Sequence, residues 1–270
     1  MYKEIKGIKV PVLGFGTWTL AGDDCAEAVA DAIQIGYRHI DTAQAYGNEE
    51  FVGKGIERSG INRNELFITT KVWFTDLQPS IIKRKTSESL IKLKTDYIDL
   101  LLIHWPAPDM NLKRIIGAMK ELQKGGKVKA IGVSNFNMTL LEEAMKYGEI
   151  FCNQVEYHPY LNQTRLLEKA KENDILVTAY SPLAKGKALS NEKLQMIGNR
   201  YNKTASQVIL RWLVQQEKVA AIPRSSKHRH REENFEIFDF ELDEDEMKTI
   251  FSLDANERQI NPAWAPEWTS

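Results

Sequence analysis

Residues 98–105 read IDLLLIHW, a nearly continuous apolar run that ends in a histidine and a tryptophan. Such a run suits a strand that is buried on both faces, as in a parallel sheet. Seven further runs of the same character occur along the chain. They are VLGFGTW (12–18), HIDTA (39–43), FITTKVW (67–73), KAIGVSN (129–135), NQVEY (153–157), LVTAYSP (176–182) and AAIPRS (220–225). The sequence therefore predicts eight parallel strands.

Most segments between these runs have the apolar spacing of helices. Cys25 and Val29 fall on one helical face, and Gly36 follows at the position where glycine commonly ends a helix. Capping-box patterns at Thr204–Gln207 and Asp243–Glu246 predict the starts of two more helices. Eight strand–helix units within 270 residues predict a single (β/α)8 TIM-barrel domain, residues 1–270.

Three additions to the barrel are expected. Residues 2–10 alternate around Lys6 and Gly7, which predicts an N-terminal β-hairpin on the barrel floor. Two extra helices are expected, one over roughly residues 190–200 and one after the eighth unit. The alternative fold is a doubly wound open sheet. It is less favoured because the first turn carries Gly14 and Gly16 but lacks the third glycine of a dinucleotide fingerprint.

The composition excludes several classes of protein. The chain is 43% hydrophobic and 27% charged, with a formal net charge of −1, which gives no reason to expect a nucleic-acid or membrane partner. No apolar run approaches the ~20 residues that span a bilayer, and the start MYKEIKGIKV lacks a signal-peptide core. Cys25 and Cys152 are interpreted as small core residues in a reducing compartment. We expect a cytoplasmic monomer.

Polar or ionisable residues stand at the end of nearly every predicted strand. In such barrels the carboxyl ends of the strands form the face that carries the chemistry. The residues are Asp41, Tyr46, Lys71, His104, Ser134, Asn135, Gln154, Tyr180, Ser181, Arg224 and Ser225. Taken alone, Asp41 is typical of a turn and His104 of a core histidine. Lys71 is harder to explain, because an unpaired ammonium within FITTKVW would carry a large desolvation cost. The joint occurrence indicates one shared site.

Four of these side chains have complementary chemistry. The Tyr46 phenol has a reference pKa of about 10, and a lysine cation beside it would lower that pKa. Asp41 would hold Lys71 charged and in place, while a neutral His104 imidazole could orient a carbonyl oxygen. This set predicts a proton donor for an oxygen that becomes negative as hydride arrives. A Schiff base on Lys71 stays open as an alternative, and the scattered histidines predict no metal site.

The chain resembles the aldo-keto reductase family, and the resemblance runs nearly from end to end. The blocks that carry it, in the family's order, are GFGTW (14–18), YRHIDTAQAYGNE (37–49), TTKVW (69–73), DYIDLLLIHWP (96–106), IGVSNF (131–136), NQVEYHPY (153–160), AYSPL (179–183) and IPRS (222–225). The resemblance, to a prokaryotic-type member with short loops, implies a TIM-barrel oxidoreductase that reduces small aldehydes or ketones with NADPH. It also implies a catalytic tetrad of Asp41, Tyr46, Lys71 and His104.

The resemblance further implies cofactor-binding roles. Ser134, Asn135 and Gln154 would bind the nicotinamide carboxamide, with Tyr180 stacked on the ring. The other residues implied to bind NADPH are Thr17, Ser181, Leu183, Arg224, Ser225, Ser226, Lys227, His230, Glu233 and Asn234. The family usually carries an arginine where this chain has His230, which is flanked by Arg229 and Arg231. A histidine binds phosphate less strongly than arginine, so we expect a modest preference for NADPH, with NADH still usable.

The substrate site is expected to be aromatic. Trp18, Trp73 and Trp105 adjoin the tetrad in sequence and should line the barrel mouth. The short connection PAPDMN (106–111) predicts an open, aromatic-walled cleft. The Trp264 and Trp268 tail either folds over this cleft or packs elsewhere. A function of another class, a catalytically weak nucleotide-sensing or scaffold barrel, is disfavoured by the intact tetrad.

Overall fold

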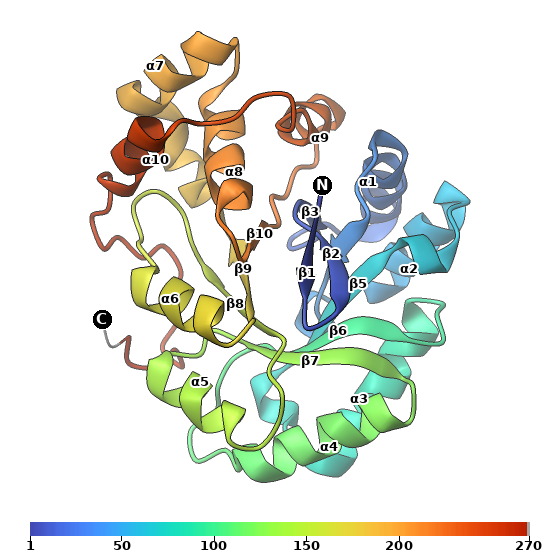
Figure 1. Cartoon of the computed structure of the whole chain (residues 1–270). Helices are drawn as coiled ribbons and strands as arrows, with labels where there is room; N and C mark the ends of the chain where they lie inside the picture. Colours follow the sequence, from blue (N-terminus) through green and yellow to red (C-terminus); the bar gives the residue numbers. More distant parts are fainter. Residues whose placement is uncertain (269–270) are drawn as a thin grey trace.

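The computed structural model describes residues 1–268, and its central feature is an eight-stranded parallel sheet. In spatial and sequence order the strands are β3 (Gly14–Gly16), β4 (His39–Asp41), β5 (Phe67–Val72), β6 (Ile98–Ile103), β7 (Val128–Ser134), β8 (Cys152–Glu156), β9 (Leu176–Tyr180) and β10 (Val219–Ala221). A bridge between Leu13 and Ala221 joins the two edges. The sheet is therefore a barrel (Figure 1), and the eight predicted strands are confirmed.

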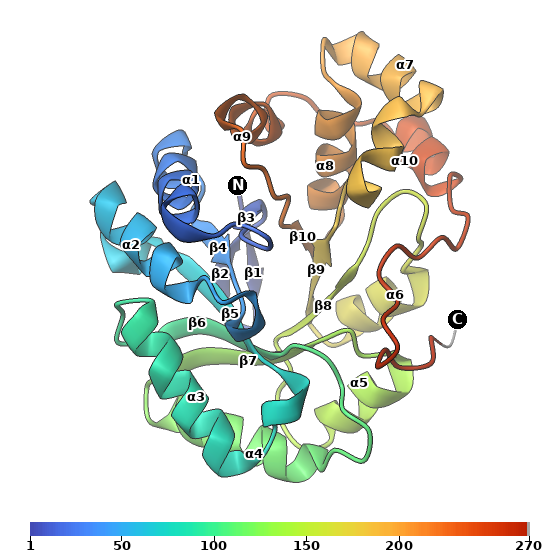
Figure 2. The same ribbon diagram turned by 180° about the vertical axis from the view of Figure 1, so that it is seen from behind.

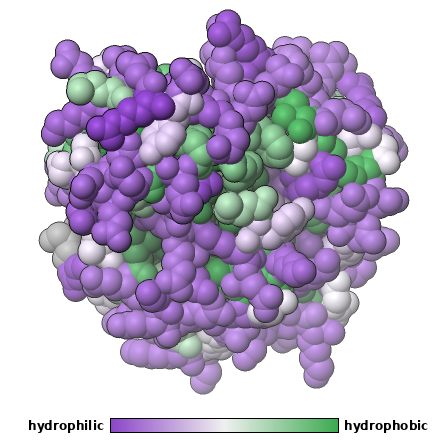
Figure 3. All heavy atoms as spheres, turned by 45° about the horizontal axis from the view of Figure 1, so that its top comes forward, coloured by the Kyte–Doolittle hydropathy of each residue, from purple (hydrophilic) through white to green (hydrophobic). Residues whose placement is uncertain are grey.

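Helices surround the barrel (Figures 1 and 2). They are α1 (Gly22–Ile35), α2 (Glu49–Ser59), α3 (Pro79–Lys92), α4 (Leu112–Lys124), α5 (Met138–Met145), α6 (Thr164–Glu172), α8 (Ala205–Gln215) and α9 (His228–Phe235). Their apolar faces pack on the strands in one large core, while polar residues face outward and give the mainly hydrophilic surface of Figure 3. Gly36 ends α1 with φ of 129°, donating to the carbonyls of Ala32 and Ile33 as the glycine signal predicts.

The two extra helices are confirmed as α7 (Glu192–Tyr201) and α10 (Glu244–Phe251). Both predicted capping boxes form, at Thr204 with Gln207 before α8 and at Asp243 with Glu246 before α10. Four 3-10 helices lie in the connections. They are η1 (Gln44–Tyr46), η2 (Arg63–Glu65), η3 (Phe74–Asp76) and η4 (Ala184–Ser190).

The predicted hairpin seals the barrel floor. Strands β1 (Tyr2–Ile5) and β2 (Ile8–Pro11) pair antiparallel, and Lys6 and Gly7 between them have φ of 47° and 77°. Ile5 and Val10 join an inner cluster with Phe67, Leu100 and other residues of the barrel strands. The ammonium of Lys3 donates to the carbonyls of Val214 (2.8 Å) and Val219 (2.7 Å), which fastens the hairpin to the barrel.

Cys25 and Cys152 are buried and unpaired, and burial raises the pKa of their thiols to about 11 and about 12. They are core residues, as the sequence predicts. Within residues 1–268, none of the helices combines the length and apolar character that crossing a membrane requires.

Candidate active site

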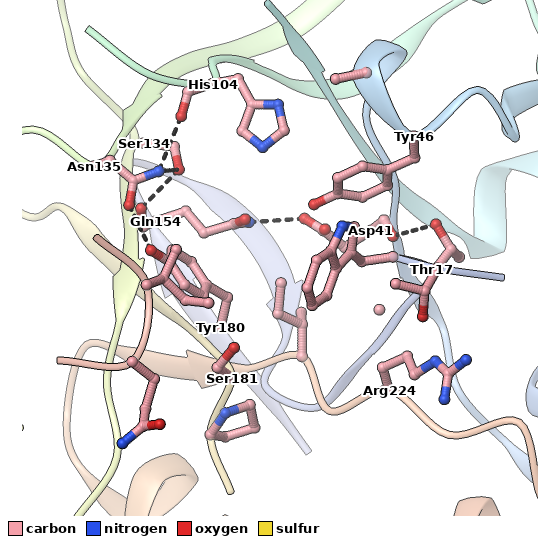
Figure 4. Close-up of a pocket in the computed structure, with 18 of the residues that line it drawn as sticks. Thr17, Asp41, Tyr46, His104, Ser134, Asn135, Gln154, Tyr180, Ser181 and Arg224 are labelled. Atoms are coloured by element: carbon pink, nitrogen blue, oxygen red, sulfur yellow. Dashed lines mark hydrogen bonds between the residues drawn. The ribbon is translucent and has the colours of Figure 1, made fainter. Parts of the chain in front are cut away.

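A cavity of about 800 Å³ opens at the carboxyl ends of the strands (Figure 4). Of the residues predicted for the site, those that line it are Thr17, Trp18, Asp41, Tyr46, Trp73, His104, Trp105, Ser134, Asn135, Gln154, Tyr180, Ser181, Leu183 and Arg224. They come from the ends of all eight barrel strands or the loops that follow them, with Lys71 of β5 buried behind the lining. The strand-end pattern thus brings together side chains that are far apart in sequence.

Asp41 and Lys71 form a buried ion pair at the inner end of the cavity. The Lys71 Nζ atom lies 2.6 Å from Asp41 Oδ1 and also donates to the Thr42 carbonyl at 2.8 Å. The second oxygen, Oδ2, accepts the amide of Gln154 at 2.7 Å. Burial alone would lower the pKa of Lys71, but Asp41 and Tyr46 raise it above its ordinary value. The lysine is held charged, as the sequence analysis expects.

The Tyr46 phenol lies next in this chain of polar groups. Its Oη atom is 3.4 Å from Lys71 Nζ and lines the cavity. Burial raises the pKa of Tyr46, and Asp41 adds to that rise, while Lys71 opposes it. The lysine acts in the predicted direction, but burial outweighs it, because desolvation penalises a phenolate inside the barrel. The phenol is therefore protonated at neutral pH.

The loop that carries Tyr46 is fastened by Asn48, a residue that the sequence analysis does not single out. The Asn48 side chain accepts from the Thr42 hydroxyl at 2.8 Å and donates to the carbonyls of Thr17 (2.8 Å) and Leu20 (2.9 Å). These bonds join the loops after β3 and β4. The only sequence signal is an asparagine directly before α2, which reads as an ordinary cap.

His104 lies beside Tyr46 (Figure 4), with the two ring centroids 5.6 Å apart. Its other aromatic neighbour is Trp73, at 5.1 Å between centroids. Burial, together with the Lys71 cation, holds the pKa of His104 well below its ordinary value. The imidazole is neutral at pH 7, as predicted, and its buried Nδ1 atom has no hydrogen-bond partner among the described residues.

Across the cavity, Ser134, Asn135 and Tyr180 form a connected polar wall (Figure 4). The Tyr180 hydroxyl donates to Oδ1 of Asn135 at 2.7 Å. The side-chain Nδ2 of Asn135 donates to the Ser134 hydroxyl and the His104 backbone carbonyl, both at 3.0 Å. Asn135 has φ of 61°, a conformation that asparagine tolerates better than most residues. The Tyr180 ring is thereby fixed in orientation at the cavity wall.

The loop after β9 continues this wall. Ser181 has φ of 48°, and Ala184 and Lys185 also have positive φ, so the backbone turns sharply next to the cavity. Ser181 and Leu183 line the cavity as expected, and so do Lys185 and Gly186, which the sequence analysis does not name. Continuity with Leu183 is the signal that could have found them.

The predicted adenosine-binding residues run from Arg224, after β10, through Lys227 and into α9, where Glu233 and Asn234 lie near the end of the helix. Arg224, Ser226, Lys227 and His230 are exposed, whereas Ser225 and Asn234 are buried. The Asn234 side chain accepts from Ser206 at 2.8 Å, and Glu233 pairs with Arg229 at 2.7 Å. Among the described residues, the exposed side chains of Arg224, Lys227 and His230 form no ion pair.

Arg231 does not belong to this exposed group. Its guanidinium is buried, donates to Asp31 at 2.6 Å and to the Ser225 carbonyl at 3.2 Å, and holds α9 against α1. Although Arg231 flanks His230 in sequence, its guanidinium is not available to a phosphate. Arg231 lies on the same helical face as Asn234, which is turned toward the barrel.

The tryptophans form an aromatic rim. Trp18 is 51% exposed, Trp105 is buried, and Trp73 lies between His104 and Trp264. All three predicted tryptophans line the cavity. The ring of Trp264 stacks on Phe74 with centroids 5.6 Å apart.

The coil after α10 runs past α6 toward α5 (Figure 2). Gln259, Ile260, Asn261 and Pro262 of this coil line the cavity with Trp264, and Trp268 contacts Trp105 with centroids 6.3 Å apart. Of the two positions that the sequence leaves open, the tail therefore takes the one over the cleft. We call residues 258–264 the C-terminal strap. No local pattern in the sequence indicates where this coil packs.

The fold and this site define a class of protein: a barrel enzyme with a lysine-paired tyrosine and a neutral histidine at its mouth. Among residues 1–268, no three histidine, cysteine or carboxylate side chains are placed to hold a metal ion. Residues 12–255 match the model of the aldo/keto reductase family. The chain belongs to the aldo-keto reductase family and is a carbonyl reductase. The family uses nicotinamide cofactors.

Named relatives cover almost the whole chain. The chain is 46% identical to the glyoxal reductase of Bacillus subtilis, with 93% of this chain and 92% of the relative covered. It is 41% identical to the methylglyoxal reductase DkgB of Escherichia coli O157:H7, with 96% and 99% covered. Among solved structures, that of aldose reductase from Schistosoma japonicum matches with a TM-score of 0.93 at 32% identity, covering 99% and 98%. One described as a candidate 2,5-diketo-D-gluconic acid reductase B matches with a TM-score of 0.97 at 44% identity, covering 100% and 98%.

Proposed function

We propose that this enzyme uses NADPH to reduce small aldehydes and ketones, with Tyr46 as the proton donor. The observation that carries the proposal is the chain from Asp41 through Lys71 to the Tyr46 hydroxyl, which ends at the cavity beside His104. A buried, protonated phenol next to a fixed cation is suited to give up a proton only when a stronger base is formed beside it.

The roles of the four side chains follow from their charges. When bound, reduced nicotinamide supplies a hydride to the carbonyl carbon. The Tyr46 hydroxyl then donates its proton to the carbonyl oxygen as negative charge develops there. Lys71, at 3.4 Å, stabilises the phenolate left on Tyr46, and Asp41 keeps that cation in place. Neutral His104 donates a hydrogen bond that orients the carbonyl oxygen.

The cavity residues suit a nicotinamide dinucleotide. Ser134, Asn135 and Gln154 provide amide and hydroxyl groups for a carboxamide, and Tyr180, held by Asn135, provides a flat surface for the ring. Thr17 lines the same cavity. Ser181 and Leu183 lie where the sharply turned loop could hold a pyrophosphate.

At the far end, we propose that the 2′-phosphate and adenosine of NADPH are bound by the α9 region. Arg224, Lys227 and His230 are exposed there and supply the positive or ionisable groups. The remaining proposed contacts are Ser225, Ser226, Glu233 and Asn234. Because only one arginine of the region is free of an ion pair among the described residues, the preference over NADH is modest.

The rim tryptophans support small carbonyl substrates with few specific polar contacts. Trp18, Trp73 and Trp105 give an apolar wall, and the relatives named for glyoxal and methylglyoxal reduction suggest short dicarbonyl compounds as first candidates. A Schiff base on Lys71 is disfavoured, because its ammonium is raised in pKa and already bonded to Asp41 and Thr42. A charged amine is no nucleophile.

Tyr46→Phe tests the proposal. The ring and its packing stay, but the proton is lost, so turnover of aldehydes should fall by roughly 10²–10⁴-fold while the Kd for NADPH, measured by calorimetry, stays within about twofold. Tyr97→Phe is the matched control, since Tyr97 precedes β6 at the other end of the barrel, and it should keep wild-type turnover. A Tyr46→Phe enzyme with a large fraction of wild-type turnover would remove Tyr46 from the mechanism.

A further inference from the structure

Glu156, the last residue of β8, is a fully buried carboxylate that the proposed mechanism does not use. Among the described residues that line the cavity, Glu156 does not appear. A carboxylate that is withdrawn from water and left unpaired is strongly destabilising, so its partners show what the charge is for.

Most of these partners belong to the C-terminal strap. Glu156 Oε1 accepts the backbone amide of Gln259 at 2.7 Å, and Oε2 accepts that of Ile260 at 3.0 Å. Arg258 Nη1 lies 3.8 Å from Oε2. Among the described residues, the partner outside the strap is His158, whose Nε2 atom lies 3.1 Å from Oε1. Two adjacent main-chain amides on one carboxylate fix both the position and the direction of the strap at that point.

The bound segment is the part of the strap that closes the cleft. Gln259 and Ile260, which donate to Glu156, line the cavity themselves, and Asn261, Pro262 and Trp264 follow directly. The strap is also tied to the loop after β9, because Lys185 Nζ donates to the Gln259 carbonyl at 3.2 Å. Farther along the chain, the ring of Trp268 packs on Arg258, with 3.6 Å between the guanidinium and the ring centroid.

We propose that Glu156 is a positioning residue for the substrate: its buried carboxylate latches the C-terminal strap so that residues 259–264 form one wall of the substrate cleft. Glu156 acts through the strap and does not touch the reacting atoms. The inference rests on carbonyl reduction as the activity, but not on Tyr46 as the proton donor or on NADPH as the cofactor. Its tests therefore include measurements that do not depend on either.

Glu156→Gln is the informative variant. The amide keeps the shape of the carboxylate but loses its charge. Its NH2 group would face a backbone N–H donor of the strap, so one of the two hydrogen bonds from Gln259 and Ile260 would be lost. The strap should loosen, so exchange of the Gln259 and Ile260 amides should speed up by at least roughly tenfold. The KM for a small aldehyde should rise roughly tenfold with kcat within about threefold, since a wall supplies binding that is equal in ground and transition states. The Kd for NADPH should be unchanged.

Asp99→Asn is the matched control. Asp99 is also a buried carboxylate that accepts a backbone amide, from Ile68 at 2.9 Å, and it pairs with Arg63 at 2.6 Å away from the cavity. This variant should lose stability, measured by thermal unfolding, without a change in KM. If it raises KM as much as Glu156→Gln does, the effect is general loosening of the barrel and the latch is rejected.

A double-mutant cycle with Trp264→Ala separates the strap from a direct field effect of Glu156 on the site. With the wall already removed, Glu156→Gln should change KM by less than about threefold. An undiminished effect in that background overturns the proposal, as does a Glu156→Gln enzyme with unchanged KM and amide exchange.

Should Glu156→Gln fail to fold, the unaltered enzyme still decides. Its Gln259 and Ile260 amides should exchange at least roughly tenfold more slowly than those of Asn261 and Trp264, for which no acceptor is found among the described residues. Equal exchange rates at these four positions would rule the latch out.

Discussion

The Nζ atom of Lys71 lies 2.6 Å from Oδ1 of Asp41, and neither side chain has significant contact with solvent. Each charge is compensated by the other, since Asp41 raises the pKa of Lys71 against the effect of burial. A pair of this kind is stable only while both members are present.

Replacing Lys71 with Met should therefore affect both stability and rate. Asp41 would keep Gln154 but lose its counter-ion, so the free energy of unfolding in urea should fall by ~3–5 kcal/mol. Turnover should fall at least ~100-fold, because the phenolate of Tyr46 loses its stabilising cation. The double variant Lys71→Met, Asp41→Asn should recover most of the stability but none of the rate. A folded Lys71→Met enzyme with its rate and pH profile intact would show that Lys71 and Tyr46 are uncoupled.

Truncating the rim tryptophans should alter substrate choice. Trp18→Ala and Trp105→Ala each remove a large apolar wall at the cavity, so relative kcat/KM values across a panel of aldehydes should shift by roughly 10- to 100-fold. The Kd for NADPH serves as the control and should change less than the substrate preference. An unchanged substrate profile in both variants would assign these rings to packing alone.

The ratio of kcat/KM for NADPH to that for NADH should be above one in the wild type. Arg224→Ala should reduce the ratio by roughly 10- to 100-fold, since a charge-assisted hydrogen bond to phosphate is worth ~1.5–3 kcal/mol. His230→Arg should raise it. Arg229→Ala is the control that the structure supplies, because Arg229 is paired with Glu233, and it should leave the ratio unchanged. Equal use of both cofactors by the wild type would contradict the 2′-phosphate assignment.

The stability of the enzyme should decrease on mild acidification because of His39. Burial lowers the pKa of this histidine to about 4, whereas an unfolded histidine titrates near 6.5. Between these values the unfolded chain binds a proton that the folded chain does not, so the free energy of unfolding decreases as the pH falls. His39 alone contributes up to about 1.4 kcal/mol per pH unit to this slope. His104, whose pKa burial also lowers, acts in the same direction. His39→Gln should make the slope between pH 6.5 and 4 shallower by the contribution of His39. A wild-type enzyme equally stable at pH 7 and pH 4.5 would refute this.

The elements that depend on local patterns are predictable from the sequence. The strand runs predict β5 and β6, and the strand-end rule then brings Lys71 and His104 to one face of the barrel. The hairpin at Lys6 and Gly7 is local, as are the capping boxes at Thr204 and Asp243. In each case a periodicity or a fixed spacing carries the information.

Contacts that are long-range and irregular are not predictable from the sequence. Glu156 meets Gln259 across 103 residues, and neither residue lies in a pattern that points to the other. The effect of burial on a pKa is not predictable from the sequence either. The strand-end pattern places Lys71 beside Tyr46, but it does not show that burial outweighs this cation and raises the pKa of the phenol. For Arg231, helical periodicity could have shown that it turns inward while Arg229 turns out.

The hairpin also decides how the enzyme can be handled. Tyr2 and Lys9 are exposed on the sealed floor, whereas Glu267 accepts a bond from Asn137 close to Trp268 on the cleft side. An immobilisation resin or a fluorescent label attached through the hairpin would thus leave the substrate cleft open to diffusing substrate. Attachment near residue 267 would crowd the entrance and strain the wall that selects what enters.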